Sequence, residues 1–316
     1  MDIVYLDQNK WIELSRVHAR TVDSGPIANL YSQLLEAVKS GQVLFPLSAS
    51  HVLETSKRND PVSRVHLAAT QAALSRGYVY RSRAGRLEVE IHCAVHRLFG
   101  TTPPELPPRW VIAHGFLQAF EQMDTLVAPP DQVQRLARIY ANIDPAELYV
   151  GYMKDQDDER RRLAHIKLAE SASDLVDRIE TRRKRLSGES VDLRRRAYSV
   201  QLFMDHQDSF IRILTSLGYS FEQFTALGDR VKAFVEDVPT LNVEAEMAAR
   251  LEAKTGFVAP NDLFDIQAFY TAIPYSSRVV AEKASISRAR QAKLDVRYKV
   301  ALSQSLLDLV DLYPQR

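Results

Sequence analysis

The chain has 316 residues, of which 46% are apolar, and its 41 Lys and Arg residues nearly balance its 40 Asp and Glu residues. This composition excludes a disordered chain and lacks the overall basic charge of many nucleic-acid-binding proteins. A single cysteine, Cys93, excludes an internal disulfide framework. No apolar run is long enough to cross a bilayer and no signal-type segment is evident, so we expect a cytoplasmic protein that does not bind membranes.

Strand and helix patterns alternate in the first third of the chain. The apolar run that ends at Leu6 predicts a buried strand at about residues 2–6, and a second strand is expected at 43–45. Helices are expected from Gln8, over 27–40, from about Ser48, over 61–75 and over 85–99, with an extended piece at 78–81. This rhythm favours a parallel sheet covered by helices.

A Pro-rich segment at 102–108 interrupts this pattern, and only helical patterns follow from Asp131 to about Leu241. Strand patterns return at 278–281 and at 298–301. We therefore expect an α/β core built from residues 1–82 and 240–316. A large, mostly helical insertion over residues 83–239 would interrupt that core.

Acidic side chains recur near the ends of predicted strands. Asp7 closes the first strand, Glu54 lies about two turns into the helix after the second, and Glu282 follows a later strand. The carboxyl ends of parallel strands border the crevice where open α/β sheets bind ligands, so these acids are candidates for one site. Alternatives remain open: Asp7 as a helix N-cap, Glu54 as an ion-pair partner one helical turn away, and Glu282 in an exposed pair with Lys283.

A predicted helix with Asn261 as its N-cap carries two further carboxylates, Asp262 and Asp265, on one face of its first turn. The helix is apolar around most of its circumference, which is typical of a buried helix. Two carboxylates on such a helix repel each other and resist desolvation unless a cation lies between them. Mg²⁺ or Mn²⁺, bound by oxygen ligands, would remove that conflict.

These features together resemble the PIN-like domain family of metal-dependent ribonucleases, in particular uncharacterised bacterial members that open with a Leu-Asp-Gln-Asn type motif. The resemblance covers roughly residues 1–82 and 240–316. It rests on Leu6 to Asn9, on Glu54, on residues 261–265 and on residues 272–283. It implies a three-layer α/β/α fold with a parallel sheet, and an acidic pocket that holds Mg²⁺ or Mn²⁺ for phosphodiester hydrolysis.

The resemblance implies catalytic and metal-binding roles for Asp7, Glu54, Asp262 and Glu282, with Asp265 as a further metal ligand. The substrate-binding candidates are Asn9, Ser48, Arg58, Arg64, Ser277 and Arg278. Asn9 and Ser48 would orient water or contact a phosphate, and the arginines would anchor a phosphate or pair with the acids. Related proteins often carry an acidic residue where this chain has Ser276, Ser277 and Arg278, which implies a weaker metal subsite in which Ser277 holds a metal-bound water.

The first hypothesis is therefore a metal-dependent endoribonuclease acting on RNA or single-stranded DNA, with the insertion as a lid or as a platform for a protein partner. The alternative is a catalytically decayed PIN-like module that binds nucleic acid or protein, in a toxin–antitoxin or phage-defence system. A phosphohydrolase of the haloacid dehalogenase type also begins with a strand and an Asp. That class needs a second Asp where this chain has Asn9.

Two further patterns have competing interpretations. Basic runs at 160–162, 182–185 and 194–196 would follow a nucleic-acid backbone, or would form a mixed-charge helix surface with the acids among them. His92 and His96 have a spacing that suits zinc, but no further ligand lies nearby in sequence, and a partly buried amphipathic helix explains them better.

Overall fold

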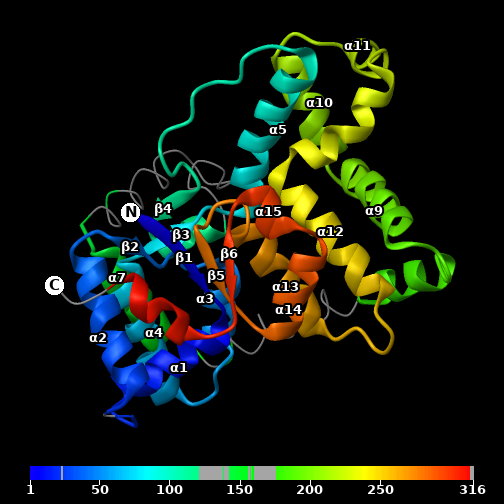
Figure 1. Ribbon diagram of the computed structural model, residues 1–316. Helices are drawn as coiled ribbons and strands as arrows, with labels where there is room; N and C mark the ends of the chain where they lie inside the picture. The colour runs from blue at the N-terminus through cyan, green and yellow to red at the C-terminus, as the bar shows by residue number, and fades with distance from the viewer. Residues whose placement is uncertain are drawn as a thin grey trace. The chain divides into compact units, whose positions relative to one another are not determined.

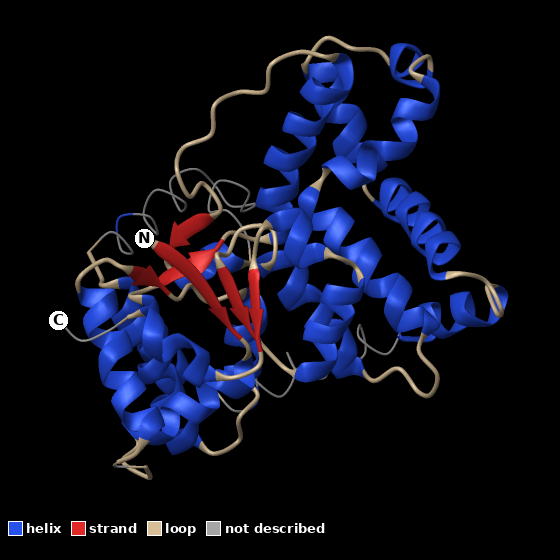
Figure 2. Ribbon diagram, viewed as in Figure 1, coloured by secondary structure: helices blue, strands red, loops and turns tan. Residues whose placement is uncertain are grey.

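The computed structural model describes residues 1–22, 24–120, 142–155 and 176–313, together with the single positions 138, 157 and 159 (Figures 1 and 2). It is a mostly helical α/β structure with a four-stranded parallel sheet and a two-stranded antiparallel sheet. The chain divides into two compact units. The first comprises residues 1–82, 111–171 and 275–316, and the second comprises residues 83–110 and 172–274.

The parallel sheet belongs to the first unit and confirms the predicted sheet type. Its strands are β1 (Asp2–Leu6), β2 (Val43–Leu44), β5 (Arg278–Val280) and β6 (Ala301–Ser303). Their order is β2-β1-β5-β6, and Leu6 pairs with Val280 at the carboxyl ends of the two central strands. Strands from the two ends of the chain therefore lie side by side, and the last strand begins three residues later than expected.

The described α-helices of the first unit are α1 (Gln8–His18), α2 (Pro26–Lys39), α3 (Ala49–Ser56), α4 (Pro61–Ser75), α7 (Pro145–Lys154), α14 (Lys283–Gln291) and α15 (Leu294–Tyr298), with 3₁₀ helices η1 (Phe116–Ala119) and η4 (Leu306–Leu312). Local sequence explains several boundaries. The side chain of Asp60 caps α4 by accepting a hydrogen bond from the Ser63 amide, and Pro61 occupies the first helical position. The predicted bounds of α4 are confirmed.

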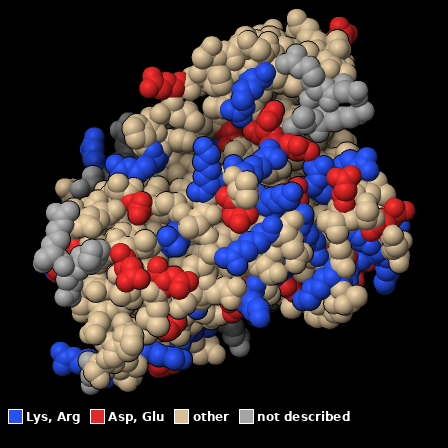
Figure 3. All heavy atoms as spheres, in the orientation of Figure 1, with Lys and Arg blue, Asp and Glu red and all other residues tan. Residues whose placement is uncertain are grey.

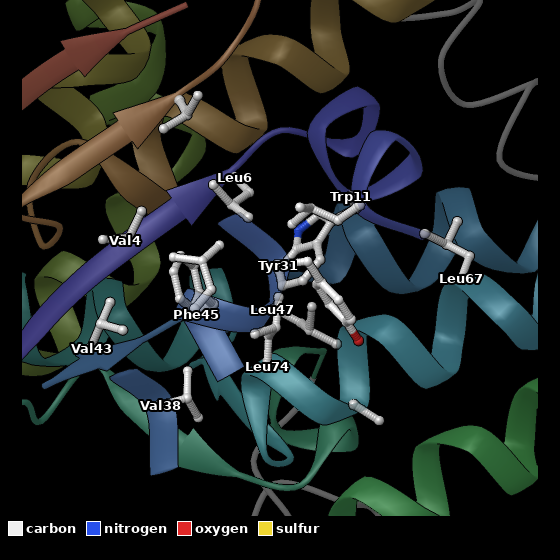
Figure 4. Close-up of a cluster of buried hydrophobic side chains, with 14 of the residues drawn as sticks. Val4, Leu6, Trp11, Tyr31, Val38, Val43, Phe45, Leu47, Leu67 and Leu74 are labelled. Atoms are coloured by element: carbon white, nitrogen blue, oxygen red, sulfur yellow. The ribbon is translucent and has the colours of Figure 1, made fainter. Parts of the chain in front are cut away.

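Both faces of β1 are buried, which explains its nearly continuous apolar sequence. Val4 and Leu6 alternate into a cluster with Trp11 and Phe45, shown in Figure 4, whereas Tyr5 lies on the opposite face. Burying an apolar side chain of this size contributes roughly 1.5–3 kcal/mol. The apolar run therefore anchors the end of β1, where Asp7 follows.

A second, antiparallel sheet pairs β3 (Tyr78–Tyr80) with β4 (Ile112–His114). The first of these strands matches the predicted extended piece, but the sequence analysis did not anticipate β4. The amide of Leu47 donates to the Tyr78 carbonyl at 3.0 Å, and the Tyr80 amide donates to the Leu47 carbonyl at 2.8 Å. The segment after β2 is thereby held beside this sheet.

The described elements of the second unit are α5 (Arg83–Phe99), α9 (Val191–Asp205), α10 (Gln207–Ser216), α11 (Phe221–Thr225), η3 (Gly228–Asp237), α12 (Pro239–Ala253) and α13 (Pro260–Ala272). Helix α13 starts at Pro260, with Ala259 rather than Asn261 as its N-cap, because proline is favoured at the first helical position. Residues 111–171 cluster with the first unit and 240–274 with the second, whereas the sequence analysis divided the chain at 82 and 240. Among the helices of the described residues, none is both long and apolar enough to span a membrane.

Candidate active site

Asp7 joins the end of β1 to the start of α1. Its amide donates to the Val280 carbonyl at 2.9 Å, which extends the pairing of β1 with β5 by one residue. Its carbonyl accepts from Lys10 and Trp11, and its Oδ1 accepts from the Gln8 amide at 2.9 Å. Asp7 is therefore the N-cap of α1, as one interpretation of the sequence held, and it also lies at the carboxyl edge of the parallel sheet.

Glu282 is the second residue after β5, where it is the N-cap residue of α14. The side-chain amide of Asn9 donates a hydrogen bond to Oε1 of Glu282. Both side chains are exposed, so a solute can reach them. The structure thus brings together Asp7, Asn9 and Glu282, which the sequence analysis placed in one site.

Glu54 is half-buried on α3, and its effect on Tyr5 shows its position. Burial raises the pKa of the Tyr5 phenol well above its ordinary value, and the charges of Asp7 and Glu54 raise it further. Both carboxylates must lie close enough to this buried phenol to oppose its ionisation. Tyr5 is therefore neutral at physiological pH. Because both charges act on this one phenol, Glu54 and Asp7 lie near the same buried side chain.

A buried polar group lies beside Tyr5. The hydroxyl of Ser48 contacts the Ser50 hydroxyl at 2.7 Å, and the Ser48 amide donates to Nδ1 of His51 at 3.0 Å. Nδ1 therefore accepts, which places the proton of a neutral imidazole on Nε2. Burial lowers the pKa of His51 to about 3, and its ring stacks on that of Tyr5 at 4.9 Å. His51 is thus neutral at physiological pH, and Ser48 is part of a helix cap.

Gln8 belongs to a buried hydrogen-bond chain behind the acids. Its Nε2 donates to the Thr55 hydroxyl at 3.2 Å, and that hydroxyl donates to Oε1 of Gln71 at 3.0 Å. The same oxygen accepts from the hydroxyl of Tyr149 at 2.6 Å. Because Gln8 follows Asp7 and Thr55 follows Glu54, this chain fixes the residues next to two of the candidate acids.

Tyr5, His51, Gln71 and Tyr149 were missed by the sequence analysis. The motif Ser48-x-x-His51 resembles a capping box, in which a residue three positions after the N-cap bonds back to it. That pattern was the available signal for His51. The partners of Gln71 come from distant parts of the chain, so no local pattern identifies it.

Ser277 and Arg278 lie at the amino end of β5, the edge opposite Asp7 and Glu282. The Ser277 hydroxyl donates to the Ile3 carbonyl at 3.0 Å, and the same oxygen accepts from the Ile3 amide. A residue that precedes a strand lies at the other edge from one that follows it. The structure therefore does not bring Ser277 or Arg278 to the acids, and Ser277 serves the backbone of β1.

Arg58 and Arg64 bond within the protein. Arg64 is only 2% exposed, and its guanidinium donates to the carbonyls of Met153 at 2.9 Å and Arg58 at 2.7 Å. Met153 lies in the last turn of α7, where helix carbonyls lack helical partners. Arg58 itself donates to the Ser63 hydroxyl at 3.0 Å. Because Arg64 is buried and its guanidinium is hydrogen-bonded to backbone carbonyls, its role is structural, and it does not contact a substrate.

Asp262 and Asp265 lie on α13 in the second unit. Oδ2 of Asp262 accepts from the Ala259 amide at 3.0 Å, and its Oδ1 lies 4.0 Å from Nζ of Lys254. Asp262 thus caps its own helix, and Asp265, half-buried, is one turn further on. A place for these two residues in the site with Asp7 stays a prediction.

Carboxylate oxygens suit Mg²⁺ or Mn²⁺, so the donor chemistry at this edge fits such an ion. Within the described residues, however, no three His, Cys, Asp or Glu side chains are grouped closely enough to hold one. The same finding covers His92 and His96, whose rings lie 4.9 Å apart on α5. The edge therefore supplies ligands of the right type without a complete ligand set among the described residues.

The carboxyl edge thus carries two acids that follow the adjacent central strands, Asp7 and Glu282, and the Asn9 amide that bonds Glu282. A third acid, Glu54, lies close enough to Tyr5 for its charge to act on the buried phenol. Comparisons with known proteins found no matching family model, no similar curated protein and no similar solved structure.

Proposed function

We propose that the chain is a metal-dependent endoribonuclease with a PIN-like core, and that Asp7 and Glu282 are its central acids. The observation that carries the proposal is their position in the strand order β2-β1-β5-β6. The chain leaves β1 toward β2 on one side, and leaves β5 toward β6 on the other. The point between β1 and β5 is therefore the topological switch point, where open α/β sheets bind ligands.

The same topology supports the three-layer arrangement. Crossovers between parallel strands are right-handed in nearly all proteins. Because β1 to β2 and β5 to β6 run in opposite directions across the sheet, right-handed crossovers put α1 with α2 on one face and α14 with α15 on the other. Helices on both faces of a parallel sheet give three layers.

In the proposed site the protein side chains have distinct tasks. Asp7 and Glu282 would hold Mg²⁺ or Mn²⁺ together with Glu54 and the predicted ligands Asp262 and Asp265. The ion would offset the charge of the phosphate and lower the pKa of a bound water. Asn9 fixes the carboxylate of Glu282 by its hydrogen bond. Tyr5 and His51, both buried and neutral, stack on each other, and Tyr5 lies two residues before Asp7 on β1.

The test is cleavage of a labelled single-stranded RNA pool, with single-stranded DNA in parallel, in Mn²⁺, Mg²⁺ or chelator. Wild type should cut RNA only with metal, and Asp7→Asn should lower the rate by a factor on the order of 10² or more. Asp60→Asn is the matched control, since Asp60 also caps a helix with its side chain but does not follow a strand of the parallel sheet. No cutting in any metal, or equal loss in both variants, would refute the proposal.

Two observations favour the alternative, a decayed PIN-like module that binds without cleaving. Within the described residues no three carboxylates are grouped for a metal, and Ser276 bonds the buried Tyr80 hydroxyl at 2.7 Å. The cleavage assay decides between the two. Metal-independent RNA binding with no cleavage would favour the module.

A further inference from the structure

A strongly basic segment follows the candidate site directly. Residues 283–299 contain Lys283, Arg288, Arg290, Lys293, Arg297 and Lys299, but only one acid, Asp295. The whole chain, by contrast, has a net charge of only +1. The segment forms α14 and α15, the crossover from β5 to β6. Positive charge is therefore concentrated on one crossover of the parallel sheet.

The lysines of this segment point outward, whereas Arg290 donates to the Leu302 carbonyl at 2.7 Å and Arg288 is half-buried. Ile286, Ala289 and Leu294 are buried, whereas Lys283, Lys293 and Lys299 are exposed. This amphipathic arrangement anchors the crossover on the sheet and leaves its charged side to solvent. Figure 3 shows Lys and Arg side chains over the part of the surface where Figure 1 draws α14 and α15.

These lysines differ in their ion pairing from the arginines of the basic runs at 182–185 and 194–196. In the second unit, Arg182 pairs with Glu252 at 2.6 Å and Arg195 pairs with Glu236 at 2.6 Å. Those basic runs thus form the mixed-charge surface that one interpretation of the sequence held, while residues 160–162 lie outside the described residues. Lys283, Lys293 and Lys299 form no ion pair with any described residue. Their charges remain available to a polyanion.

The backbone places these lysines along a path from the acids. Lys283 follows Glu282 directly, so it lies at the carboxyl edge of the sheet, and α14 then runs about 13 Å away from it. Lys293 and Lys299 flank α15, and both adopt left-handed conformations with φ of 55° and 54°. Such a conformation is uncommon for residues other than glycine and makes a tight turn. It places a lysine at each end of α15.

We propose that this exposed face of α14 and α15, the α14–α15 basic face, binds the phosphate backbone of single-stranded RNA as it leaves the acidic edge. The choice of RNA rests on the proposed function, whereas the binding itself rests on charge and position. Lysines contact phosphates as point charges and read no sequence. The face therefore contributes affinity and direction rather than base specificity.

The test removes three charges and measures binding without cleavage. The triple variant Lys283→Gln, Lys293→Gln and Lys299→Gln is titrated with a fluorescent single-stranded RNA in chelator, between 50 and 200 mM salt. If each lysine neutralises one phosphate, the slope of log affinity against log salt should fall by about 2. At 100 mM salt the same relation gives a loss of affinity on the order of 10²-fold.

The matched control replaces three exposed lysines elsewhere, with Lys39→Gln, Lys154→Gln and Lys184→Gln, so that the net charge is equal. It should bind almost as wild type does. Circular dichroism and thermal unfolding of both variants check that each is folded. Equal losses in the two triple variants, or no RNA binding by wild type, would overturn the inference, and tighter binding of single-stranded DNA of the same sequence would overturn the choice of RNA.

Binding in chelator separates this inference from the nuclease proposal. Binding that depends on the α14–α15 basic face, without cleavage in any metal, would support the inference and refute the nuclease. Cleavage by wild type, with unchanged RNA binding in the triple variant, would support the nuclease proposal and refute the inference about the α14–α15 basic face.

Discussion

The side-chain amide of Asn9 donates a hydrogen bond to the carboxylate of Glu282, and so joins residues 273 positions apart in sequence. Asn9 lies in the first turn of α1, just after β1, and Glu282 is the second residue after β5. The bond therefore crosses the switch point of the parallel sheet. It fixes one candidate acid relative to the helix that begins at the other.

A double-mutant cycle of Asn9→Ala and Glu282→Ala tests this bond. Both side chains are exposed, so we expect a coupling of only about 0.5–1 kcal/mol in the free energy of unfolding. For cleavage, the two single variants should each lose activity, and the double variant should lose little more, because Asn9 acts through Glu282. Urea unfolding and single-turnover cleavage give the two readouts. Losses that simply add would show that Asn9 acts independently of Glu282.

Two substitutions at Asp7 separate its role as a cap from its role in chemistry. Asparagine caps helices about as well as aspartate, whereas alanine loses about 1 kcal/mol. Asp7→Asn should therefore keep the free energy of unfolding within about 0.5 kcal/mol of wild type, and Asp7→Ala should lower it by about 1 kcal/mol. Both should lower the cleavage rate by a factor on the order of 10² or more. An active Asp7→Asn protein would make Asp7 a cap alone.

Local signals explain why much of the fold could be predicted from the sequence. The Asp60-Pro61 pair fixes the start of α4, and the apolar run before Asp7 marks a strand buried on both faces. Strand β4 had no such signal, because its three residues follow a Pro-rich segment and form a strand only by pairing with β3. Its existence depends on a distant partner.

The candidate site shows the same limit. Asp7 and Glu282 were predictable, because residues that follow parallel strands share an edge. By the same rule Ser277, which precedes β5, and Arg278, which begins it, belong to the opposite edge, so their predicted role conflicted with the predicted strand itself. Arg64 could not be placed from sequence, because its hydrogen-bond partner Met153 lies 89 residues away.

The buried chain behind the acids predicts unequal effects for two conservative substitutions. Gln71→Leu removes the acceptor of two buried hydroxyls, those of Thr55 and Tyr149, and should destabilise the protein by about 3 kcal/mol. Tyr149→Phe removes only one of these bonds and should cost about 1 kcal/mol. Urea unfolding measures both. Equal costs would mean that Gln71 is not the shared acceptor.

His51 predicts how stability depends on pH. Burial lowers its pKa in the folded protein to about 3, from an ordinary value of about 6.5 in the unfolded chain. Below about pH 6.5 the His51 imidazole therefore binds a proton in the unfolded chain but not in the folded protein. The free energy of unfolding should fall as pH drops from about 6.5 toward 3, by up to about 1.36 kcal/mol per pH unit from this residue.

The variant His51→Gln tests this assignment, because glutamine can also accept the Ser48 amide in a capping box but does not titrate. It should be less stable than wild type near pH 7.5, since it loses the stacking on Tyr5, yet its stability should fall less steeply between pH 6 and 4.5. Urea unfolding at several pH values gives both slopes, with the exposed His114→Gln as control. Parallel curves for wild type and His51→Gln would show that acid sensitivity arises from other groups.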